Sequence, residues 1–528
     1  MAAKVTGVCA FLRRHAHTMP DRVALVDGAR QVTYGELDLM VERLAASFTG
    51  LGLRKFARVA LYLDKSLEMA ASFLAIGAAG LIAVPINPKL KPIQVQHILA
   101  DSAAEMLVTT PYRWSQLEEV TDPAILRSLL LTGESLPQIS GRAAFLWQDF
   151  AQATTGGALH RVIDIDPAAI LYTSGSTGMP KGVTISHRNF VAGAESVNGY
   201  LETNQDDTIL ALLPFSFDAG LSQLTTALEA GARLVLHNHL RAQEVAEICS
   251  REGVTSLTGV PPLWIQLAAV PWSEQARHTL RLFANTGGHM PRSLLGQLRD
   301  LFPKAKPYLM YGLTEAFRST YLDPAQIDKR IDSIGKAIPN AEILVVHPDG
   351  TPCDPGETGE LVHRGAHVTL GYWNAPEKTA ERFRPLTDRP ATGLVEEMAV
   401  WSGDLVRTDE DGYLYFVGRR DEMIKSSGYR ISPNEVETVL YQSEHVAEAA
   451  VIGVADPALG QAVVALVVPR TAEFDVTVLV AHCGRQLPGY MVPQIVIFGE
   501  LPRSPNGKIN RTALPDLYQE KIKERGAA

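Results

Sequence analysis

Short, continuously apolar runs alternate with helix-forming segments through most of this chain, and this alternation constrains the fold more than any other feature. Several of these runs are typical of strands buried on both faces, at residues 59–63, 83–86, 209–213 and 234–237. A helix is expected after Thr33, because Thr33 and Glu36 form a capping-box pattern and apolar residues follow at helical spacing. Since strands that alternate with helices form largely parallel sheets, the sequence predicts an α/β fold.

The chain length predicts more than one domain. The 528 residues exceed what one hydrophobic core usually holds together. Near the C-terminus, Ser432 to Glu435 again has capping-box form, with Pro433 at the first helical position, and two apolar runs follow at residues 449–454 and 462–468. We therefore predict a large N-terminal domain of packed parallel or mixed sheets with helices at residues 1–420, and a small mobile α+β domain at residues 421–528.

Composition narrows the classes of function. The formal net charge is -9 and no long basic run occurs, which argues against nucleic acid as a partner. The four cysteines lie far apart, so no disulfide framework is expected and a cytoplasmic location fits. The longest apolar segment, residues 69–84, is shorter than the ~20 residues that span a bilayer and contains two glycines. We expect it to be a buried helix followed by a strand.

A loop rich in hydroxyl groups and glycine follows another apolar run and reads TSGSTGMPK at residues 173–181. It lacks the spacing of a P-loop, but its hydroxyls and backbone amides can surround an anion, and its lysine adds a positive charge. Because such loops are also common as simple turns, the loop alone leaves both alternatives open. The residues that would contact the anion are Thr173, Ser174, Gly175, Ser176, Thr177, Gly178 and Lys181.

Three further motifs accompany this loop along the chain. They are YGLTEA at residues 311–316, SGDLVRTDEDGYLYFVGRRDEMIKSSGYRISPNEVE at residues 402–437, and PRSPNGKINR at residues 502–511. In this order the motifs resemble the adenylate-forming enzyme family, which includes acyl-CoA synthetases, firefly luciferase and the adenylation domains of nonribosomal peptide synthetases. The resemblance covers nearly the whole chain and implies a large N-terminal domain, a hinge and a mobile C-terminal lid.

The resemblance also implies a reaction in two halves. A carboxylate attacks the α-phosphate of ATP to give an acyl-adenylate and pyrophosphate, and a phosphopantetheine thiol then displaces AMP to give a thioester. The loop at residues 173–181 would hold the β- and γ-phosphates. In the YGLTEA motif, Tyr311 would stack on adenine, Thr314 would donate to the α-phosphate, and Glu315 would bind Mg²⁺, a hard cation that prefers oxygen ligands.

Other residues take their implied roles from the same resemblance. The turn of Gly287, Gly288 and His289 would pass between adenine and the acid pocket. Asp404 would accept both ribose hydroxyls, and Arg419 would make a second ribose contact.

The C-terminal motifs imply a moving lid with a catalytic lysine. Asp421 falls at the expected hinge, and Gly428 and Arg430 would lie beside the tunnel for the thiol. Lys508, in its Pro-Asn-Gly-Lys turn, would bridge the attacking carboxylate and the α-phosphate. A non-catalytic relative would be expected to lack Lys508 or Glu315, and both are present.

The segment PFSFDAG at residues 214–220 leaves two substrate classes open. Acyl-CoA synthetases often carry a histidine where Phe217 stands, whereas the pair of Phe217 and Asp218 resembles amino-acid-activating domains, in which the aspartate binds the α-ammonium group. The IKSSGYRISP segment at residues 424–433 is closer to acyl-CoA synthetases. One alternative is therefore an acyl-CoA synthetase for a fatty or aryl acid, with coenzyme A as the acceptor. The other is a stand-alone amino-acid adenylating enzyme that loads a phosphopantetheinyl carrier protein. Asp218 could instead be paired by a cation of the protein itself.

Overall fold

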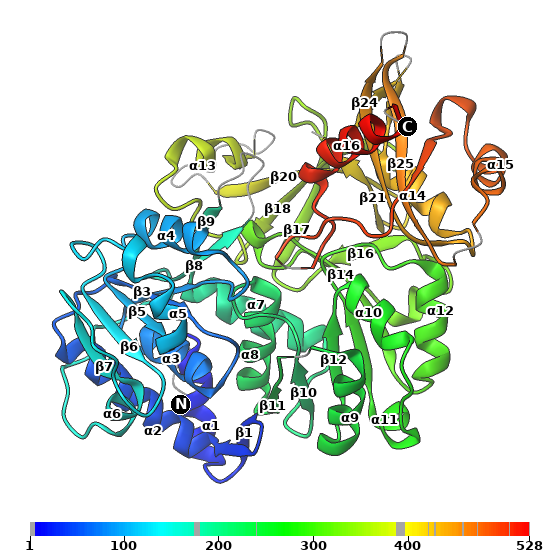
Figure 1. The fold of residues 1–528 in the computed structure, drawn as a ribbon. Coiled ribbons are helices and arrows are strands. Elements are labelled where there is room, and N and C mark those ends of the chain that lie inside the picture. The colour runs from blue at the N-terminus through cyan, green and yellow to red at the C-terminus, as the bar shows by residue number, and fades with distance from the viewer. Residues whose placement is uncertain are drawn as a thin grey trace.

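The computed structural model describes residues 6–173, 180–238, 240–386, 397–420, 422–426, 429–456, 459–471, 474–505 and 507–526. Within these residues the strands form three sheets, two in the large N-terminal part and one in the small C-terminal part (Figure 1). Helices cover the sheets, so the predicted α/β class with a small C-terminal α+β unit is confirmed.

The first sheet of the N-terminal part has the strand order β7-β6-β5-β3-β4-β8-β9. All neighbours pair in parallel except β8 and β9, which form an antiparallel pair. The strands are β3 (Arg58–Tyr62), β4 (Ile82–Pro85), β5 (Met106–Thr109), β6 (Ser128–Leu131), β7 (Ala143–Leu146), β8 (Pro167–Thr173) and β9 (Lys181–Ser186).

The second sheet continues from a parallel half into an antiparallel half, in the order β17-β18-β20-β21-β16-β15-β14-β13-β12-β10-β11-β1-β2, with β19 paired to β20. Its parallel half holds β10 (Thr208–Ala211), β11 (Arg233–Leu236), β12 (Ser256–Gly259), β13 (Leu282–Asn285) and β14 (Lys306–Tyr311), flanked by β1 (Val23–Asp27) and β2 (Arg30–Thr33). The antiparallel half holds β15 (Thr320–Leu322), β16 (Ser333–Ala337), β17 (Ala341–Val346), β18 (Thr358–Gly365), β19 (Phe383–Pro385), β20 (Met398–Thr408) and β21 (Leu414–Arg419).

The helices of the N-terminal part follow the strands in chain order. They are α1 (Cys9–Thr18), α2 (Tyr34–Gly50), α3 (Leu67–Ala78), α4 (Pro92–Asp101), α5 (Pro111–Ser115), α6 (Trp147–Gln152), α7 (His187–Leu201), α8 (Asp218–Ala230), α9 (Ala242–Glu252), α10 (Pro261–Ala268), α11 (Glu274–Thr279), α12 (Arg292–Leu301) and α13 (Pro376–Arg382). The predicted capping box before α2 is confirmed, because Glu36 N donates to Thr33 Oγ1 at 3.2 Å and Thr33 N donates to Glu36 Oε2 at 2.9 Å. The apolar segment at residues 69–84 forms most of α3 and then β4, as predicted.

The main core lies where the two large sheets face each other across α7 and α8 (Figure 1). Phe190 of α7 and Leu224 of α8 are fully buried there, together with residues of β3, β8 and β10. The two sheets therefore share one core. Among the described helices none is long and apolar enough to cross a membrane.

The small C-terminal unit has its own sheet, in the order β23-β22-β25-β24, with β26 paired to β25. Its elements are β22 (Ile424–Ser426), β23 (Tyr429–Ile431), α14 (Pro433–Tyr441), β24 (Val446–Asp456), β25 (Gly460–Pro469), α15 (Val476–Gln486), β26 (Gln494–Ile497) and α16 (Leu514–Gly526). The predicted boundary at residue 420 falls between β21 and β22, and the division into two units that move against each other stays a prediction.

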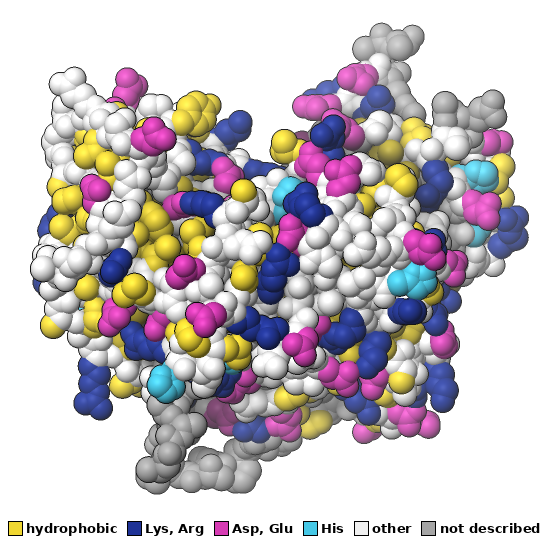
Figure 2. Space-filling view, turned by 90° about the horizontal axis from the view of Figure 1, so that it is seen from below, with side chains coloured by type: hydrophobic (Ala, Val, Ile, Leu, Met, Phe, Trp, Pro, Cys, Tyr) yellow, Lys and Arg dark blue, Asp and Glu magenta, His cyan; other side chains and the backbone are white. Residues whose placement is uncertain are grey.

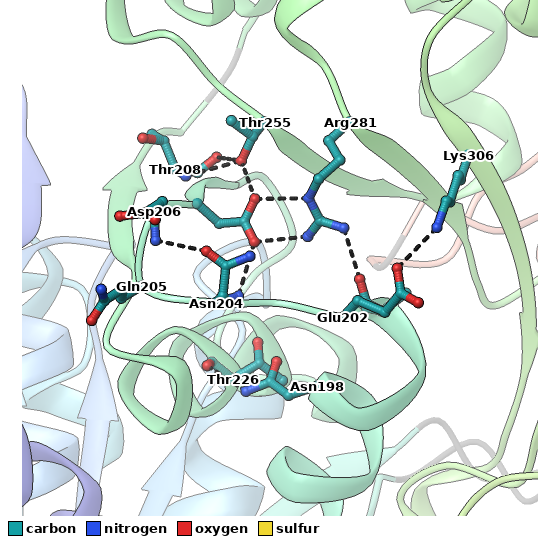
Figure 3. Close-up of polar contacts among 12 residues, drawn as sticks. Asn198, Glu202, Asn204, Gln205, Asp206, Thr208, Thr226, Thr255, Arg281 and Lys306 are labelled. Atoms are coloured by element: carbon teal, nitrogen blue, oxygen red, sulfur yellow. Dashed lines mark hydrogen bonds and ion pairs between the residues drawn. The ribbon is translucent and has the colours of Figure 1, made fainter.

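A saturated ion-pair network holds the amino ends of the central strands together (Figure 3). Arg281, before β13, donates from Nε and Nη2 to the two carboxylate oxygens of Asp207 at 3.0 and 2.7 Å. The same carboxylate accepts from Thr255 Oγ1 at 2.6 Å and from Asn204 N at 3.0 Å. The loops described next lie at the opposite, carboxyl ends of these strands.

The face shown in Figure 2 carries basic and acidic side chains side by side. Among the described residues seen there, neither sign of charge forms a continuous field.

Candidate active site

The carboxyl ends of the strands β12, β13 and β14 lie side by side, and those of β13 and β14 carry several of the predicted site residues. These three strands are parallel neighbours, so their carboxyl ends lie at one edge of the sheet. The turn with Gly287 follows β13, and Thr314 and Glu315 follow β14. Two motifs far apart in the sequence therefore meet at one place.

The glycine turn after β13 depends on its backbone geometry. Gly287 has a φ of +72°, a conformation that glycine adopts without strain. Asn285 Nδ2 donates to Gly288 O at 2.8 Å, which fixes the turn from below, and His289 is exposed at its end. A Cβ atom at Gly287 would lie 3.0 Å from Lys508 Cε and 3.2 Å from its Nζ. The lysine of the small domain therefore reaches the turn of the large domain.

A short turn of the C-terminal segment positions Lys508. Ser504 N donates to Lys508 O at 2.8 Å, and Gly507 N donates to Ser504 O at 2.9 Å. Gly507 has a φ of +82°, and its carbonyl accepts from Arg503 Nη1 at 2.9 Å. The C-terminal segment, red in Figure 1, descends here from the small domain toward the large one.

Lys508 lies in a field of mixed charge. Its side chain is still open to solvent, yet protein surrounds it closely, and the resulting loss of hydration lowers its pKa. The carboxylates of Asp218 and Asp404 oppose this shift in pKa, whereas the guanidinium groups of Arg419 and Arg318 add to it. The ammonium group thus stands among residues that the sequence assigned to the nucleotide and to the acid.

The residues predicted to bind adenine and ribose contact one another. Tyr311 OH donates to Asp404 Oδ2 at 2.5 Å, and Arg419 Nε donates to Asp404 Oδ1 at 3.1 Å. Asp404 and Arg419 are direct partners on the paired strands β20 and β21. Burial, with the Asp404 carboxylate next in weight, raises the pKa of Tyr311 well above its usual value. Tyr311 therefore stays protonated as a donor, a role that its motif did not indicate.

The residues predicted to hold magnesium and phosphate also lie together. Tyr372 OH donates to Glu315 Oε1 at 2.6 Å, and Lys181 Nζ lies 5.7 Å from the centre of the Tyr372 ring. Thr173 and Lys181 are paired residues at the ends of β8 and β9. This pairing holds Thr173 next to Lys181. Sequence reasoning missed Tyr372, which no motif marks.

The residue that follows the YGLTEA motif has an unusual backbone conformation, and its side chain is packed in the core. Thr314 to Ala316 form a short 3-10 helix, and Phe317 follows with a φ of +56° and a ψ of -56°, which is unusual for a residue with a side chain. The Phe317 ring is fully buried and lies 5.7 Å from the ring of Phe190. Buried packing beside Glu315 therefore fixes the direction in which Thr314 and Glu315 point.

The candidate acid pocket lies at the start of α8. Phe217 precedes the helix and Asp218 is its first residue, where a carboxylate is favoured by the helix dipole. Arg318 Nη1 lies 3.7 Å from Asp218 Oδ2, and only 4% of the Arg318 side chain is exposed. Asp218 thus has a cation of the protein beside it, the alternative that the sequence had left open, and sequence reasoning missed Arg318.

Several predicted residues lie outside the described parts of the chain. These are Ser174, Gly175, Ser176, Thr177 and Gly178 of the loop, the expected hinge residue Asp421, and Gly428. For Arg430 the backbone alone is described, and it pairs with Lys425 between β23 and β22. The roles of all these residues stay predictions.

Comparisons with known proteins match almost the entire chain. The model of a family described as AMP-binding enzyme matches residues 12–373, and that of the AMP-binding enzyme C-terminal domain matches residues 435–508. An indoleacetate–CoA ligase of Aromatoleum aromaticum is 30% identical over 97% of this chain and 98% of its own length. An L-proline–[L-prolyl-carrier protein] ligase of Streptomyces coelicolor is 33% identical over 91% of both chains.

Solved structures show the same similarity. The anthranilate CoA ligase AuaEII in complex with anthranoyl-AMP has a TM-score of 0.86 at 26% identity and covers 98% of both chains. The o-succinylbenzoate coenzyme A synthetase of Bacillus subtilis, in complex with ATP and a magnesium ion, has a TM-score of 0.81 at 26% identity, with 96% of this chain and 98% of that chain covered.

Proposed function

The chain belongs to the AMP-binding enzyme family, a family of AMP-forming ligases, and on that premise we propose that it activates a carboxylic acid with ATP and transfers the acyl group to a phosphopantetheine thiol. The position of Lys508 gives this proposal its strongest support. Lys508 of the small domain reaches the Gly287 turn, among the residues expected to bind ATP and the acid. A lysine held there serves the first half-reaction directly.

ATP binding is divided between two groups of residues. Asp404 accepts the ribose hydroxyls, and the ring of Tyr311 lies against adenine while its hydroxyl holds Asp404 in place. Lys181 and the loop before it hold the β- and γ-phosphates. The contact between Glu315 and Tyr372 places a carboxylate on the same side as Lys181. The nucleotide would thereby extend from the β20–β21 hairpin, which carries Asp404, to the start of β9, which carries Lys181.

Glu315 and Thr314 offer oxygen atoms, the donors that Mg²⁺ prefers, so the residues present fit this cation. When bound, Mg²⁺ would neutralise charge on the phosphates of ATP. The hydrogen bond from Tyr372 OH orients the Glu315 carboxylate for this purpose.

Lys508 acts electrostatically in adenylate formation. The acid's carboxylate oxygen attacks the α-phosphorus, the bond from phosphorus to the bridging oxygen breaks, and pyrophosphate leaves. Negative charge grows on the α-phosphate oxygens during this step, and a positioned ammonium group stabilises it. The protein that surrounds Lys508 lowers its pKa, and a bound anion beside the ammonium group would act in the opposite direction and favour the charged form.

We propose coenzyme A as the acceptor, because the segment at residues 424–433 resembles that of acyl-CoA synthetases. The amino-acid alternative rested on the resemblance of Phe217 and Asp218 to amino-acid-activating domains, in which the aspartate binds the α-ammonium group. Arg318 beside Asp218 weakens that argument, since the carboxylate already has a cation within 3.7 Å. A carrier-protein acceptor remains the second candidate, favoured by the similarity to a carrier-protein ligase.

Acid-dependent exchange of pyrophosphate into ATP tests the proposal. A panel of fatty, aryl and amino acids should contain members that support exchange in the presence of Mg²⁺. Single-turnover assays with coenzyme A and with a phosphopantetheinyl carrier protein should then show thioester with coenzyme A. Thioester with the carrier alone would refute the acceptor, and exchange with no acid at all would refute the activity.

A further inference from the structure

Arg318 is a buried arginine with too few hydrogen-bond partners. Its side chain is 4% exposed, and a guanidinium group carries five N–H donors. Nη1 lies 3.4 Å from Thr286 Oγ1 and 3.7 Å from Asp218 Oδ2, so both contacts are long. Nε is buried without any partner. Since a buried donor without an acceptor is costly, Arg318 is arranged for an acceptor that the protein does not supply.

Ion pairs elsewhere in the chain show what a structural role looks like. Asp207 and Arg281 meet through two hydrogen bonds of 3.0 and 2.7 Å, and Thr255 and Asn204 satisfy the remaining carboxylate sites (Figure 3). Arg511 donates to both oxygens of Glu437 at 2.6 and 2.7 Å. In these pairs both carboxylate oxygens accept short hydrogen bonds from the arginine, whereas Arg318 makes a single long contact with Asp218. Arg318 therefore differs from the pairs that hold the fold together.

Arg318 also lines an enclosed cavity between α7, α8 and the strands β10, β12 and β14. Its volume is about 20 Å³, roughly the space that one water molecule occupies. Half of its lining side chains end in a hydroxyl or an amide, among them Ser222, Gln223, Thr226, Ser256 and Thr258, and most of the others are apolar. A cavity of this size has no room for a long alkyl chain, so an acid that reaches Arg318 is expected to be short.

We propose that Arg318 selects the acid, and that the acid is short and carries a second carboxylate. The inference rests on the proposed function and names the substrate class of the same site. One carboxylate lies by Lys508 and reacts, and the other accepts hydrogen bonds from the Arg318 guanidinium, a geometry that arginine and carboxylate groups share. Asp218 orients the guanidinium from the start of α8, and Thr286 supports it after β13.

Matched sets of acids test this selection by pyrophosphate exchange. Butyrate, succinate and γ-aminobutyrate share a four-carbon chain, and benzoate, phthalate and anthranilate share an aromatic ring. Within each set the acids are of nearly equal size and differ only in their second group. The first acid has no second polar group (the neutral member), the second has a second carboxylate (the anionic member) and the third has an amino group (the amino member). In the wild-type protein, the anionic member of at least one set should give a kcat/KM about tenfold or more above that of its neutral partner, because the neutral acid leaves the buried donors of Arg318 unpaired.

Variants locate the preference in Arg318. Arg318→Met removes the charge at similar length and should abolish the preference for the anionic acid, whereas Arg318→Lys should keep part of it. Arg281→Met is the control, since it removes the cation of a buried carboxylate in a pair of structural type and should leave the order of the acids unchanged.

The outcomes separate the two proposals. Wild-type preference for the neutral or the amino member in both sets would overturn the dicarboxylate inference while leaving adenylation intact, and so would an anionic preference that survives in a folded Arg318→Met variant. Should that variant not fold, the wild-type order of the acids still decides. Exchange with no acid of any set or panel would overturn the proposed function and the inference together.

Discussion

Lys508 shows how much of the chemistry depends on the placement of one side chain. Its turn is closed by backbone hydrogen bonds, its ammonium group touches the Gly287 turn, and acidic and basic residues surround it. A solvated lysine near the end of a chain would need none of these features. The placement therefore supports the proposal that Lys508 serves the half-reaction in which negative charge grows on the α-phosphate.

Replacing Lys508 by alanine should separate the two half-reactions. Adenylate formation should fall by roughly 10²–10³-fold, the usual loss when one preorganised donor is removed. Thioester formation from supplied acyl-adenylate should persist, because that step does not need the ammonium group. Single-turnover assays of each half-reaction measure both rates, and an equal loss in the two would contradict the assigned role. Lys521→Ala, on the outer helix α16, is the control.

Lys65 is a buried lysine that the proposed mechanism does not use. Burial lowers its pKa from 10.5 to about 7, and Nζ donates only to Leu213 O, at 3.2 Å, beside the ring of Phe215. The unfolded chain holds this proton up to a much higher pH than the folded protein does. The free energy of unfolding should therefore rise with pH between about 7 and 10, and the full cost of the buried charge applies below about pH 7.

Lys65→Met should remove this cost and the pH dependence with it. The variant keeps the length of the side chain without its charge, so it should be more stable than the wild type at pH 6–7 by a few kcal/mol, with an advantage that fades toward about pH 10. Denaturant titrations across this pH range measure the difference. Lys306→Met, at a half-exposed lysine, should show no such trend. A difference in stability that does not change with pH would speak against a buried charge.

Motif residues could be predicted from the sequence because each stands in a local pattern. Asp404, Glu315 and Lys508 were found in this way, and the structure brings them to one region. Tyr372 and Arg318 could not be found, because their roles come from tertiary contacts rather than spacing. Tyr372 meets Glu315 across 57 residues, and Arg318 meets Asp218 only when the segment after β14 lies beside the start of α8.

At the scale of elements, apolar runs predicted the parallel strands β3, β4, β10 and β11 and the antiparallel pair β24 and β25, whereas other strands of both kinds were missed. The run at residues 59–63 became β3 at Arg58–Tyr62, a shift of one residue that its pairing with β4 and β5 determines. The strands β17 and β21 were missed, because few of their residues are fully buried and their sequences are not continuously apolar. Continuous apolarity marks only strands that are covered on both faces.

The amino ends of the central strands depend on the pair of Asp207 and Arg281 (Figure 3). Arg281→Met should lower the free energy of unfolding by about 3–5 kcal/mol, because it leaves a buried carboxylate without its cation. Thermal or denaturant unfolding measures the loss. Arg299→Met removes an exposed pair with Asp328 and should change stability much less. Equal effects of the two variants would show that the network does not hold the strands together.

At the scale of the whole molecule, the described residues of the large and small parts meet on either side of the expected hinge at Asp421, where Ser432 contacts Val417 of β21. They meet again at the turn that carries Lys508. Ser432 Oγ donates to Val417 O and accepts from Glu435 N, so the start of the small domain rests on the last strand of the large one. With Lys508 at the Gly287 turn, this arrangement suits adenylate formation.

A disulfide across the hinge should hold the protein in this arrangement. A Cβ atom at Gly418 would lie 3.8 Å from Ser432 Cβ, within the roughly 3.5–4.5 Å that disulfides require. Of the atoms near that position, Met423 Sδ at 3.1 Å belongs to a flexible side chain that can move aside. The variant Gly418→Cys with Ser432→Cys is best made together with Cys353→Ser, since Cys353 is the native cysteine that is not fully buried.

If the small domain must rotate between the half-reactions, the oxidised variant should make adenylate and pyrophosphate at close to the wild-type rate in a single turnover. Its thioester formation should fall by roughly 10²-fold, because the lid cannot present its other face to the thiol, and reduction should restore it. The single-cysteine variants, treated with the same oxidant, control for the lost helix cap at Ser432. Normal thioester formation in the fully oxidised protein would mean that rotation about this hinge is not required. Loss of adenylate formation alone would mean that the bridged arrangement serves the second half-reaction instead of the first.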